Sequence, residues 1–231
     1  MEPQAEYVRG LFTRIAGLYD VLNRVLTCGV DVLWRKRALA LLAASAAAPA
    51  SVLDLATGTA DLAIGAARRF PSARVTGVDL TPAMLEVGRR KVAAAGLADR
   101  IGLREGNALA LDLPDAAFDA ATCAFGFRNF PDMDRALAEC ARVLKPGGHL
   151  LVLELFRLES RLLARLTSLW LRGVAPLFAR RNRGDYAYLR TSIERTLSAA
   201  EFLEKARRAG FEQAGAAFYR PSCQCLVLRK I

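Results

Sequence analysis

Two acidic turns, separated by a short helical segment, are the first candidates for chemistry. An apolar run at residues 51–56 leads into a loop that carries Asp54, Gly58 and Asp61, and a second apolar run ends in Asp79, eighteen residues beyond Asp61. A glycine lets backbone approach a ligand closely, and a carboxylate at the end of the second run can accept both hydroxyls of a ribose. These residues predict a nucleoside pocket with its turn at Gly58.

The charge of this loop indicates which nucleoside it binds. A dinucleotide site typically has the pattern GxGxxG, whose glycines admit a pyrophosphate onto a helix N-terminus. Here one glycine, Gly58, stands between two acids, Asp54 and Asp61. Acids repel a pyrophosphate, but they suit the ammonium and sulfonium charges of S-adenosylmethionine. An ordinary turn between a strand and a helix, with its aspartates there by chance, is the alternative.

A third predicted strand, at 101–105, is followed by Gly106, Asn107 and Ala108. An asparagine side chain can both donate to and accept from the edge of an adenine. With the two turns above, this gives a set of residues expected to contact the cofactor: Asp54, Gly58, Thr59, Asp79, Leu80, Asn107, Ala108 and Ala124.

Alternating strands and helices would bring these turns together. Apolar runs predict strands at 51–56, 73–79, 101–105, 118–124 and 149–155, with helices at 59–70, 82–95 and 132–144. Thr81 is the expected N-cap of the helix that starts with Pro82, and residues 145–148, Lys-Pro-Gly-Gly, should end the third helix. Such alternation predicts right-handed βαβ units in a doubly wound, mainly parallel α/β sheet. Ligands bind such sheets beyond the carboxyl ends of the strands.

The two ends of the chain have patterns of their own. Helix-like spacing of apolar residues runs through 12–26, and a further helix is expected at 31–44. After a helix at 198–209, strand-like runs at 212–219 and 222–229 predict an antiparallel hairpin at the edge of the sheet.

Four stretches resemble one known family. They are 19–34, which begins Tyr19-Asp20 and ends in Trp34; 125–129, Phe-Gly-Phe-Arg-Asn; 142–154, which contains Lys-Pro-Gly-Gly; and 185–193. The chain resembles the quinone-ring C-methyltransferases of ubiquinone and menaquinone biosynthesis (demethylmenaquinone methyltransferase-like). The resemblance implies a Rossmann-like, class I S-adenosylmethionine methyltransferase. We expect a single domain over 1–231, with a helical lid at 1–45, a cofactor-binding core at 51–155, a helical insert facing substrate or membrane at 156–197, and a C-terminal helix and strands at 198–231.

The chain departs from the family pattern at four positions. The family usually has glycine at the position of Ala60, histidine at Asp31, and serine at Ala124 and Phe156. Since Ala60 opens a predicted helix, we expect it to be tolerated. The substrate-facing differences keep a methyltransferase of another small aromatic or natural product open as an alternative. A non-catalytic scaffold in a quinone-biosynthesis complex is a further one, which the intact cofactor residues disfavour.

Carbon methylation of a quinol needs a phenolate that pushes electron density onto the ring carbon. Arg128 follows the fourth predicted strand, and because an arginine stays protonated it would stabilise a phenolate rather than act as the base. The resemblance implies that Arg128 lies at the reaction centre and that Tyr19 closes the cofactor site; we expect Asn129 and Glu154 to face the substrate. The alternatives are an Arg128 that binds helix carbonyls, a Tyr19 in the core and a Glu154 in a structural ion pair.

The bulk properties bound the partners. The 231 residues fit one domain and carry a net charge of +10. Residues 155–184 hold seven arginines and one acid among apolar residues, which predicts contact with an anionic membrane surface and agrees with the prenylated quinol substrate that the resemblance implies; a core helix or a homodimer contact are the alternatives. The chain lacks an RNP-type motif, so we expect no nucleic acid partner.

The five cysteines show no CxxC spacing, so we expect no metal. The N-terminus has no signal-peptide pattern and no apolar run is long enough to span a bilayer, which predicts a cytoplasmic protein, peripheral to the membrane.

Overall fold

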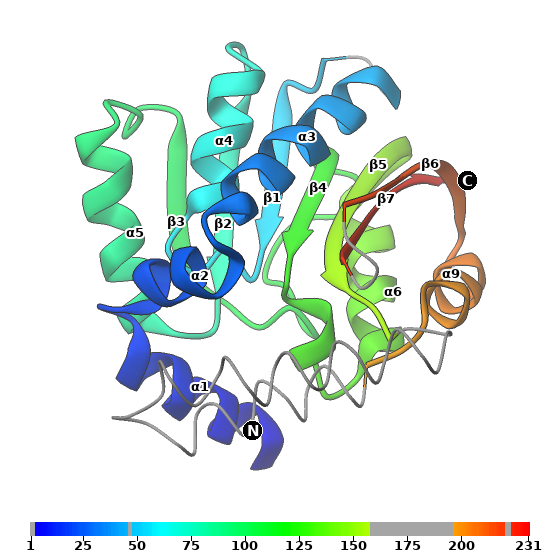
Figure 1. Ribbon diagram of the computed structural model, residues 1–231. Coiled ribbons are helices and arrows are strands. Elements are labelled where there is room, and N and C mark those ends of the chain that lie inside the picture. The colour runs from blue at the N-terminus through cyan, green and yellow to red at the C-terminus, as the bar shows by residue number, and fades with distance from the viewer. Residues whose placement is uncertain (1–2, 46–47, 158–195, 220–222) are drawn as a thin grey trace.

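The computed structural model describes residues 3–45, 48–157, 196–219 and 223–231 (Figure 1). The basic stretch at 155–184, the insert expected at 156–197 and the segment at 185–193 therefore lie almost wholly outside the described residues. Within the described ranges, no helix has the length and the apolar character that crossing a membrane requires.

The core of the fold is a seven-stranded sheet with the order β3-β2-β1-β4-β5-β7-β6. The neighbouring strands from β3 to β5 are parallel, while β7 is antiparallel to both β5 and β6. The strands are β1 Ser51–Leu55, β2 Arg74–Asp79, β3 Ile101–Glu105, β4 Phe118–Ala124, β5 Leu144–Leu155, β6 Phe211–Phe218 and β7 Cys223–Lys230. The predicted doubly wound sheet with an antiparallel C-terminal edge is confirmed.

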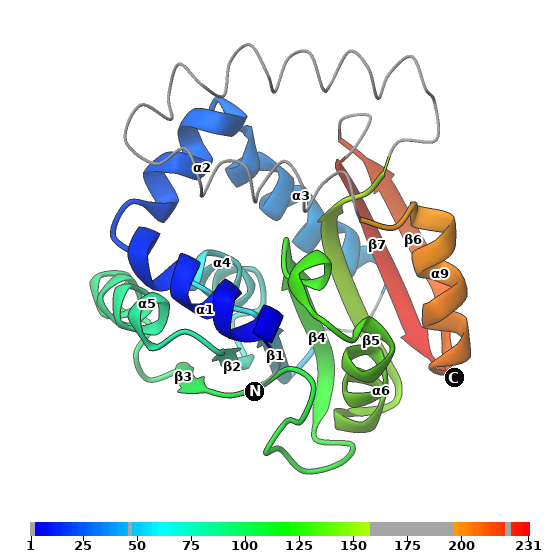
Figure 2. The ribbon, with the colours of Figure 1, turned by 90° about the horizontal axis from the view of Figure 1, so that it is seen from below.

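Helices cover both faces of this sheet (Figures 1 and 2). They are α1 Pro3–Ile15, α2 Tyr19–Thr27, α3 Val30–Ser45, α4 Asp61–Arg69, α5 Pro82–Ala94, the 3₁₀ turn η1 Phe127–Asn129, α6 Met133–Val143 and α9 Ala199–Arg208. One buried cluster joins α3, α4 and α5 to strand residues such as Val52. A second cluster joins α6 and α9 to the adjacent strand residues, such as Leu53. Successive strand residues thus serve opposite faces, as the period of a strand requires.

The N-terminal segment departs from its predicted form. The periodic run at 12–26 suggested one helix, but the chain turns at residues 16–18 and forms α1 and α2 separately. Gly17, a weak helix former, lies in that turn, where the N–H of Leu18 donates to the carbonyl of Ile15 at 2.9 Å. The break lets α1 lie across the carboxyl ends of the central strands (Figure 2).

Two predicted helix ends are confirmed in position but differ in detail. Residues 145–148 do end α6, but they belong to β5, whose pairing with β4 shifts register between the Phe118–Leu144 and Ala120–His149 pairs. The glycines permit this irregularity, because Gly147 has φ of 72°. Thr81 precedes α5 without a side-chain capping bond; its N–H donates instead to Asp79 at 2.8 Å.

Candidate active site at the carboxyl edge of the sheet

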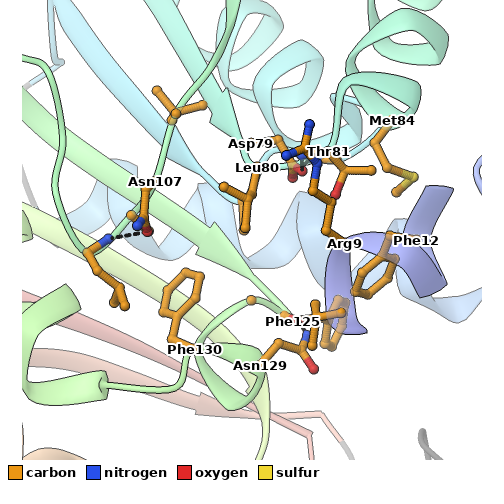
Figure 3. Close-up of a pocket in the computed structure, with 18 of the residues that line it drawn as sticks. Arg9, Phe12, Asp79, Leu80, Thr81, Met84, Asn107, Phe125, Asn129 and Phe130 are labelled. Atoms are coloured by element: carbon orange, nitrogen blue, oxygen red, sulfur yellow. Dashed lines mark hydrogen bonds between the residues drawn. The ribbon is translucent and has the colours of Figure 1, made fainter. Parts of the chain in front are cut away.

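A cavity of about 810 Å³, open to solvent, lies at the carboxyl ends of β1 to β4 under α1 (Figure 3). Strand order reverses between β1 and β4, which is where ligands bind in such sheets. Predicted site residues that line it are Tyr19, Gly58, Asp79, Leu80, Asn107, Ala108, Ala124 and Asn129. A neighbouring cavity of about 320 Å³ adds Asp54 and Thr59 and shares Tyr19, Gly58 and Ala124 with the first.

The loop after β1 has an unusual backbone. Ala56, Gly58 and Ala60 have φ of 50°, 54° and 65°, so alternate residues are left-handed. Only Gly58 adopts this conformation without a Cβ penalty. A Cβ on Gly58 would also approach the Met84 side chain to 3.3 Å. Glycine at position 58 therefore has a steric basis within the protein itself, and the close approach of its backbone to a ligand stays a prediction.

Asp79 ends β2 with its carboxylate on the cavity wall (Figure 3). Its Oδ2 accepts from the N–H of Gly58 and its Oδ1 from the N–H of Thr81, both at 2.8 Å. Burial raises the pKa of Asp79 against these bonds. The two backbone donors fix the direction of the carboxylate beside the loop after β1.

Asp54 is 1% exposed and faces the smaller cavity. Its two oxygens accept from the hydroxyls of Thr57 and Thr122, each at 2.6 Å. Burial raises the pKa of Asp54 to about 6. Within the described parts of the chain, neither Asp54 nor Asp79 forms an ion pair.

Asn107 lines the larger cavity, but its side-chain oxygen is engaged. Oδ1 accepts from the N–H of Leu109 at 2.9 Å (Figure 3), a turn that asparagine typically stabilises. This bond fixes the direction of the side chain and uses one of the two lone pairs of Oδ1, so the predicted donor and acceptor role toward an adenine edge stays a prediction.

The second acid of the loop, Asp61, lines the smaller cavity and is also bonded to two protein cations. It accepts from Lys91 of α5 at 2.5 Å and from Arg24 of α2 at 2.8 Å. Burial alone would raise the pKa of Asp61, but the bonds from these cations outweigh it and lower the pKa. Protein cations therefore compensate part of the Asp61 charge, and its predicted contact with the cofactor's positive charge stays a prediction.

The same cations tie the N-terminal helices to the cofactor loop. Asp20 of α2 accepts from Lys91 and, at 2.6 Å, from the hydroxyl of Thr59. Asp31, which replaces the family's histidine, is 1% exposed and bonds to both Arg24 and Arg35. We call Asp20, Arg24, Asp31, Arg35, Asp61 and Lys91 the interhelix ion cluster.

Arg128 and Glu154 form a buried ion pair behind the cavity. Arg128 Nη1 lies 2.5 Å from Glu154 Oε1, and the two side chains are 8% and 2% exposed. The same nitrogen donates to the carbonyl of Phe125 at 2.8 Å. Neither residue is among the described residues that line the two cavities. The alternatives stated for this pair, a bound carbonyl and a structural ion pair, describe what the structure shows.

Tyr19 and Asn129 do reach the cavity. Tyr19 lines both cavities and packs edge-on against Phe12 of α1, with ring centroids 5.8 Å apart. Asn129 lines the larger cavity and donates to the carbonyl of Phe125 at 3.2 Å. Phe125 itself has a φ of 59°, a strained value for a large residue, at the point where β4 turns into η1.

The sequence predicted a helical lid at 1–45 but did not indicate which residues of α1 reach the cavity. Val8, Arg9 and Phe12 line the larger cavity, and Arg9 bonds to Glu105, at the end of β3, at 3.2 Å. No motif marks these residues; their amphipathic spacing was the available signal, and it does not say which surface a helix will cover. Met84, Phe125 and Phe130 complete the apolar wall (Figure 3).

The two serine-to-apolar differences from the family lie in different places. Ala124 lines both cavities. Phe156 is 2% exposed and packs in the core against Phe202, with ring centroids 5.6 Å apart. Of these two departures, Ala124 is therefore the one that changes the surface of the site.

The chain is similar to known methyltransferases in its sequence and in its fold. The demethylmenaquinone methyltransferase of Thermus thermophilus is 46% identical over 80% of this chain and 83% of its own length, and that of Deinococcus radiodurans is 42% identical over 91% and 87%. The Geobacter sulfurreducens ubiquinone/menaquinone biosynthesis C-methyltransferase UbiE is 40% identical over 90% and 82%. Among solved structures, a SAM-dependent methyltransferase from Thermotoga maritima shares the fold, with a TM-score of 0.67, 22% identity and coverage of 96% and 98%.

The family model agrees with the relatives and with the geometry. The model of the ubiE/COQ5 methyltransferase family matches residues 1–223, which confirms the resemblance found in the sequence. The chain belongs to the ubiE/COQ5 methyltransferase family and is an S-adenosylmethionine-dependent methyltransferase.

Proposed function

We propose that this protein methylates a ring carbon of a prenylated quinol in quinone biosynthesis, with S-adenosylmethionine as the methyl donor. The observation that carries the proposal is the cavity at the reversal of strand order, walled by the Asp79 carboxylate and an apolar surface. The names of the relatives include both menaquinone and ubiquinone biosynthesis, so the proposal covers naphthoquinol and benzoquinol rings.

The residues at the cavity fit this donor. Asp79 would accept the ribose hydroxyls, and Leu80, Asn107 and Ala108 would bound the adenine. Asp54, Gly58 and Thr59 would surround the positively charged methionine end, where two buried carboxylates with raised pKa values leave negative charge available. When bound, the donor supplies an electrophilic methyl group. The apolar side chains Phe12, Met84 and Phe130 would exclude water from it.

Toward the ring, Arg128 is proposed to favour the phenolate over the phenol through its fixed positive charge. The bond to Glu154 and the bond to the carbonyl of Phe125 hold the guanidinium in place. Because Arg128 lies behind the cavity wall, its action requires the substrate to reach the β4–η1 turn beside Asn129. Tyr19, which lines both cavities, would close the site over the donor.

The experiment that tests the proposal is transfer of labelled methyl from S-adenosylmethionine to reduced demethylmenaquinone and, in parallel, to a demethylated ubiquinol precursor, both in detergent. We expect label in at least one ring. A protein that binds the donor but labels neither ring would overturn the substrate and favour another small aromatic, a possibility to which the missing hydroxyl at Ala124 points.

The role of Arg128 can be tested in the same assay. Arg128→Lys keeps a positive charge near Glu154 but loses the planar guanidinium. We expect turnover to fall by about tenfold or more, as for loss of an electrostatic stabiliser, with donor affinity near the wild-type value. Wild-type turnover would remove Arg128 from the mechanism. Asn129→Ala tests in parallel whether the neighbouring cavity residue changes KM for the quinol.

A further inference from the structure

The exposed apolar side chains of this protein gather on its N-terminal helices. Among the described residues, seven large apolar side chains are exposed, and five of them lie between residues 18 and 33. They are 40% to 62% exposed, and we call them the N-terminal apolar surface: Leu18, Val21, Val25, Val32 and Leu33. Single exposed apolar residues are ordinary on a protein surface, but a contiguous group marks an interaction site.

The helical geometry makes these residues contiguous. Leu18, Val21 and Val25 follow one another at spacings of three and four along α2, so they share one face. Val32 and Leu33 lie in the first turn of α3, which packs directly against α2. The two helices follow each other at the same end of the molecule (Figure 2). The opposite face of α3, with Trp34, Ala38 and Leu39, is buried in the core.

The charges around this surface have one sign. Between residues 13 and 37 the exposed charged side chains are Arg14, Lys36 and Arg37. Of the two acids in that span, Asp31 is buried and Asp20 is partly exposed, and both are bonded to cations of the interhelix ion cluster: Asp31 to Arg24 and Arg35, and Asp20 to Lys91. Lys36 and Arg37 stand one helical turn beyond Val32 and Leu33 on the same exposed stripe of α3. An apolar surface whose exposed charged neighbours are basic, and whose nearby acids are paired with cations, complements an anionic surface.

We propose that the N-terminal apolar surface docks on an anionic lipid bilayer, with its apolar side chains among the headgroups and Lys36 and Arg37 at the rim. A second copy of the chain fits less well, because a two-fold interface would bring the same cations together. The inference rests on the proposed function for its purpose: Tyr19, next to Leu18, lines both cavities, so docking would bring the site close to a substrate whose prenyl tail lies in the bilayer.

The test is co-sedimentation of the full chain with vesicles of phosphatidylcholine mixed with phosphatidylglycerol, and with vesicles of phosphatidylcholine alone. We expect binding to the anionic vesicles and much weaker binding to the neutral ones. The variant Val21→Asp/Val25→Asp should lower the partition coefficient by about tenfold or more, because apolar insertion and charge attraction both weaken. The control Ala138→Asp/Ala200→Asp adds the same charges at exposed positions of α6 and α9, on the other face of the sheet, and should change partitioning by less than about twofold.

A second matched pair tests the rim. Lys36→Glu/Arg37→Glu should lower binding to anionic vesicles by about tenfold or more, while leaving binding to neutral vesicles unchanged. Arg68→Glu/Arg69→Glu makes the same charge change at exposed positions at the end of α4 and should have a much smaller effect. Far-ultraviolet circular dichroism and donor affinity, measured on each variant, show that the fold and the cofactor half are intact.

The outcomes separate this inference from the proposed function. Methyl transfer to a short quinol without a prenyl tail should be equal in wild type and Val21→Asp/Val25→Asp, while transfer to a prenylated quinol in anionic vesicles should fall with binding. Vesicle binding that is absent, or that ignores the Val21 and Val25 changes, overturns the docking surface even if quinols are methylated. A wild-type dimer that these changes dissociate, without vesicle binding, assigns the surface to a second copy instead.

Discussion

The two halves of the site hold their buried carboxylates in different ways. In the cofactor half, Asp79 is bonded by two backbone N–H groups and Asp54 by two threonine hydroxyls. In the reaction half, beyond β4, Glu154 is bonded by the guanidinium of Arg128. Glu154 also accepts from the backbone N–H groups of Leu155 and Arg128, so a charged donor is what the second half adds to the neutral donors found in both.

This difference decides where negative charge is available. Neutral donors orient Asp54 and Asp79 without cancelling their charge, so burial raises both pKa values, and a positively charged ligand would relieve that cost. The Arg128–Glu154 pair is nearly neutral as a unit and ties the β4–η1 turn to the end of β5. The cofactor half is therefore built to receive a cation, whereas the reaction half is built to hold a cation in position.

The largest expected effect comes from breaking the reaction half. Glu154→Leu leaves the Arg128 charge buried without its partner, so the free energy of unfolding should fall by about 3–5 kcal/mol. Urea denaturation measures it. Glu212→Ala is the matched control, because Glu212 pairs with Arg229 at the surface, where such a pair contributes about 1 kcal/mol or less. The double variant Arg128→Met/Glu154→Leu should recover most of the loss; a double variant as unstable as the single one would contradict this account.

The next effect is the pH dependence that Asp54 imposes. Its pKa in the folded state is about 6, above the ordinary aspartate value of 3.8. The stabilising contribution of Asp54 is therefore complete below the pKa of the unfolded state and is lost as the pH rises through about 6. From about pH 4 to pH 7, the wild type should lose about 2–3 kcal/mol relative to Asp54→Asn. Taking the difference between the two proteins cancels the opposite contributions of Asp61 and Asp119, whose pKa values are lowered. If the free energies of unfolding of the two proteins change with pH in parallel, Asp54 ionises in the folded state at no extra cost in free energy.

A smaller effect is expected on donor affinity. Asp79→Ala removes the proposed ribose acceptor and leaves the N–H groups of Gly58 and Thr81 without their partner. The Kd for S-adenosylmethionine should rise tenfold or more, since charge-assisted bonds contribute about 1.5–3 kcal/mol each. Isothermal calorimetry measures it, with Asp112→Ala, a change at a fully solvated aspartate, as the control. An unchanged Kd would exclude Asp79 from ribose binding.

The sequence predicted the cofactor half better than the reaction half, for a physical reason. Gly58, Asp79 and Asn107 follow three parallel strands, and parallel strands deliver their carboxyl ends to one edge. The partners of Asp61, Arg128 and the cavity wall at Arg9 come from elements distant in sequence, and no local pattern specifies which side chain will meet them. The limits of β3, Ile101–Glu105, and of β4, Phe118–Ala124, were predicted in full. The backbone of the loop after β1 was not, because φ depends on the turn as a whole.

The energetic cost of the left-handed backbone in the loop after β1 can be measured at Ala60. The sequence suggested a tolerated helix start, but the structure places Ala60 at φ 65°, in a conformation that costs an alanine about 1–2 kcal/mol. Ala60→Gly removes that strain but loses a buried methyl group and gives the unfolded chain more freedom. We expect a net gain of about 0.5–1 kcal/mol in the free energy of unfolding. Ala63→Gly, also fully buried but inside α4, is the matched control and should lose about 1 kcal/mol or more. If both glycines destabilise the protein alike, the loop after β1 is not strained at Ala60. Its left-handed backbone then has no energetic cost that ligand binding could relieve.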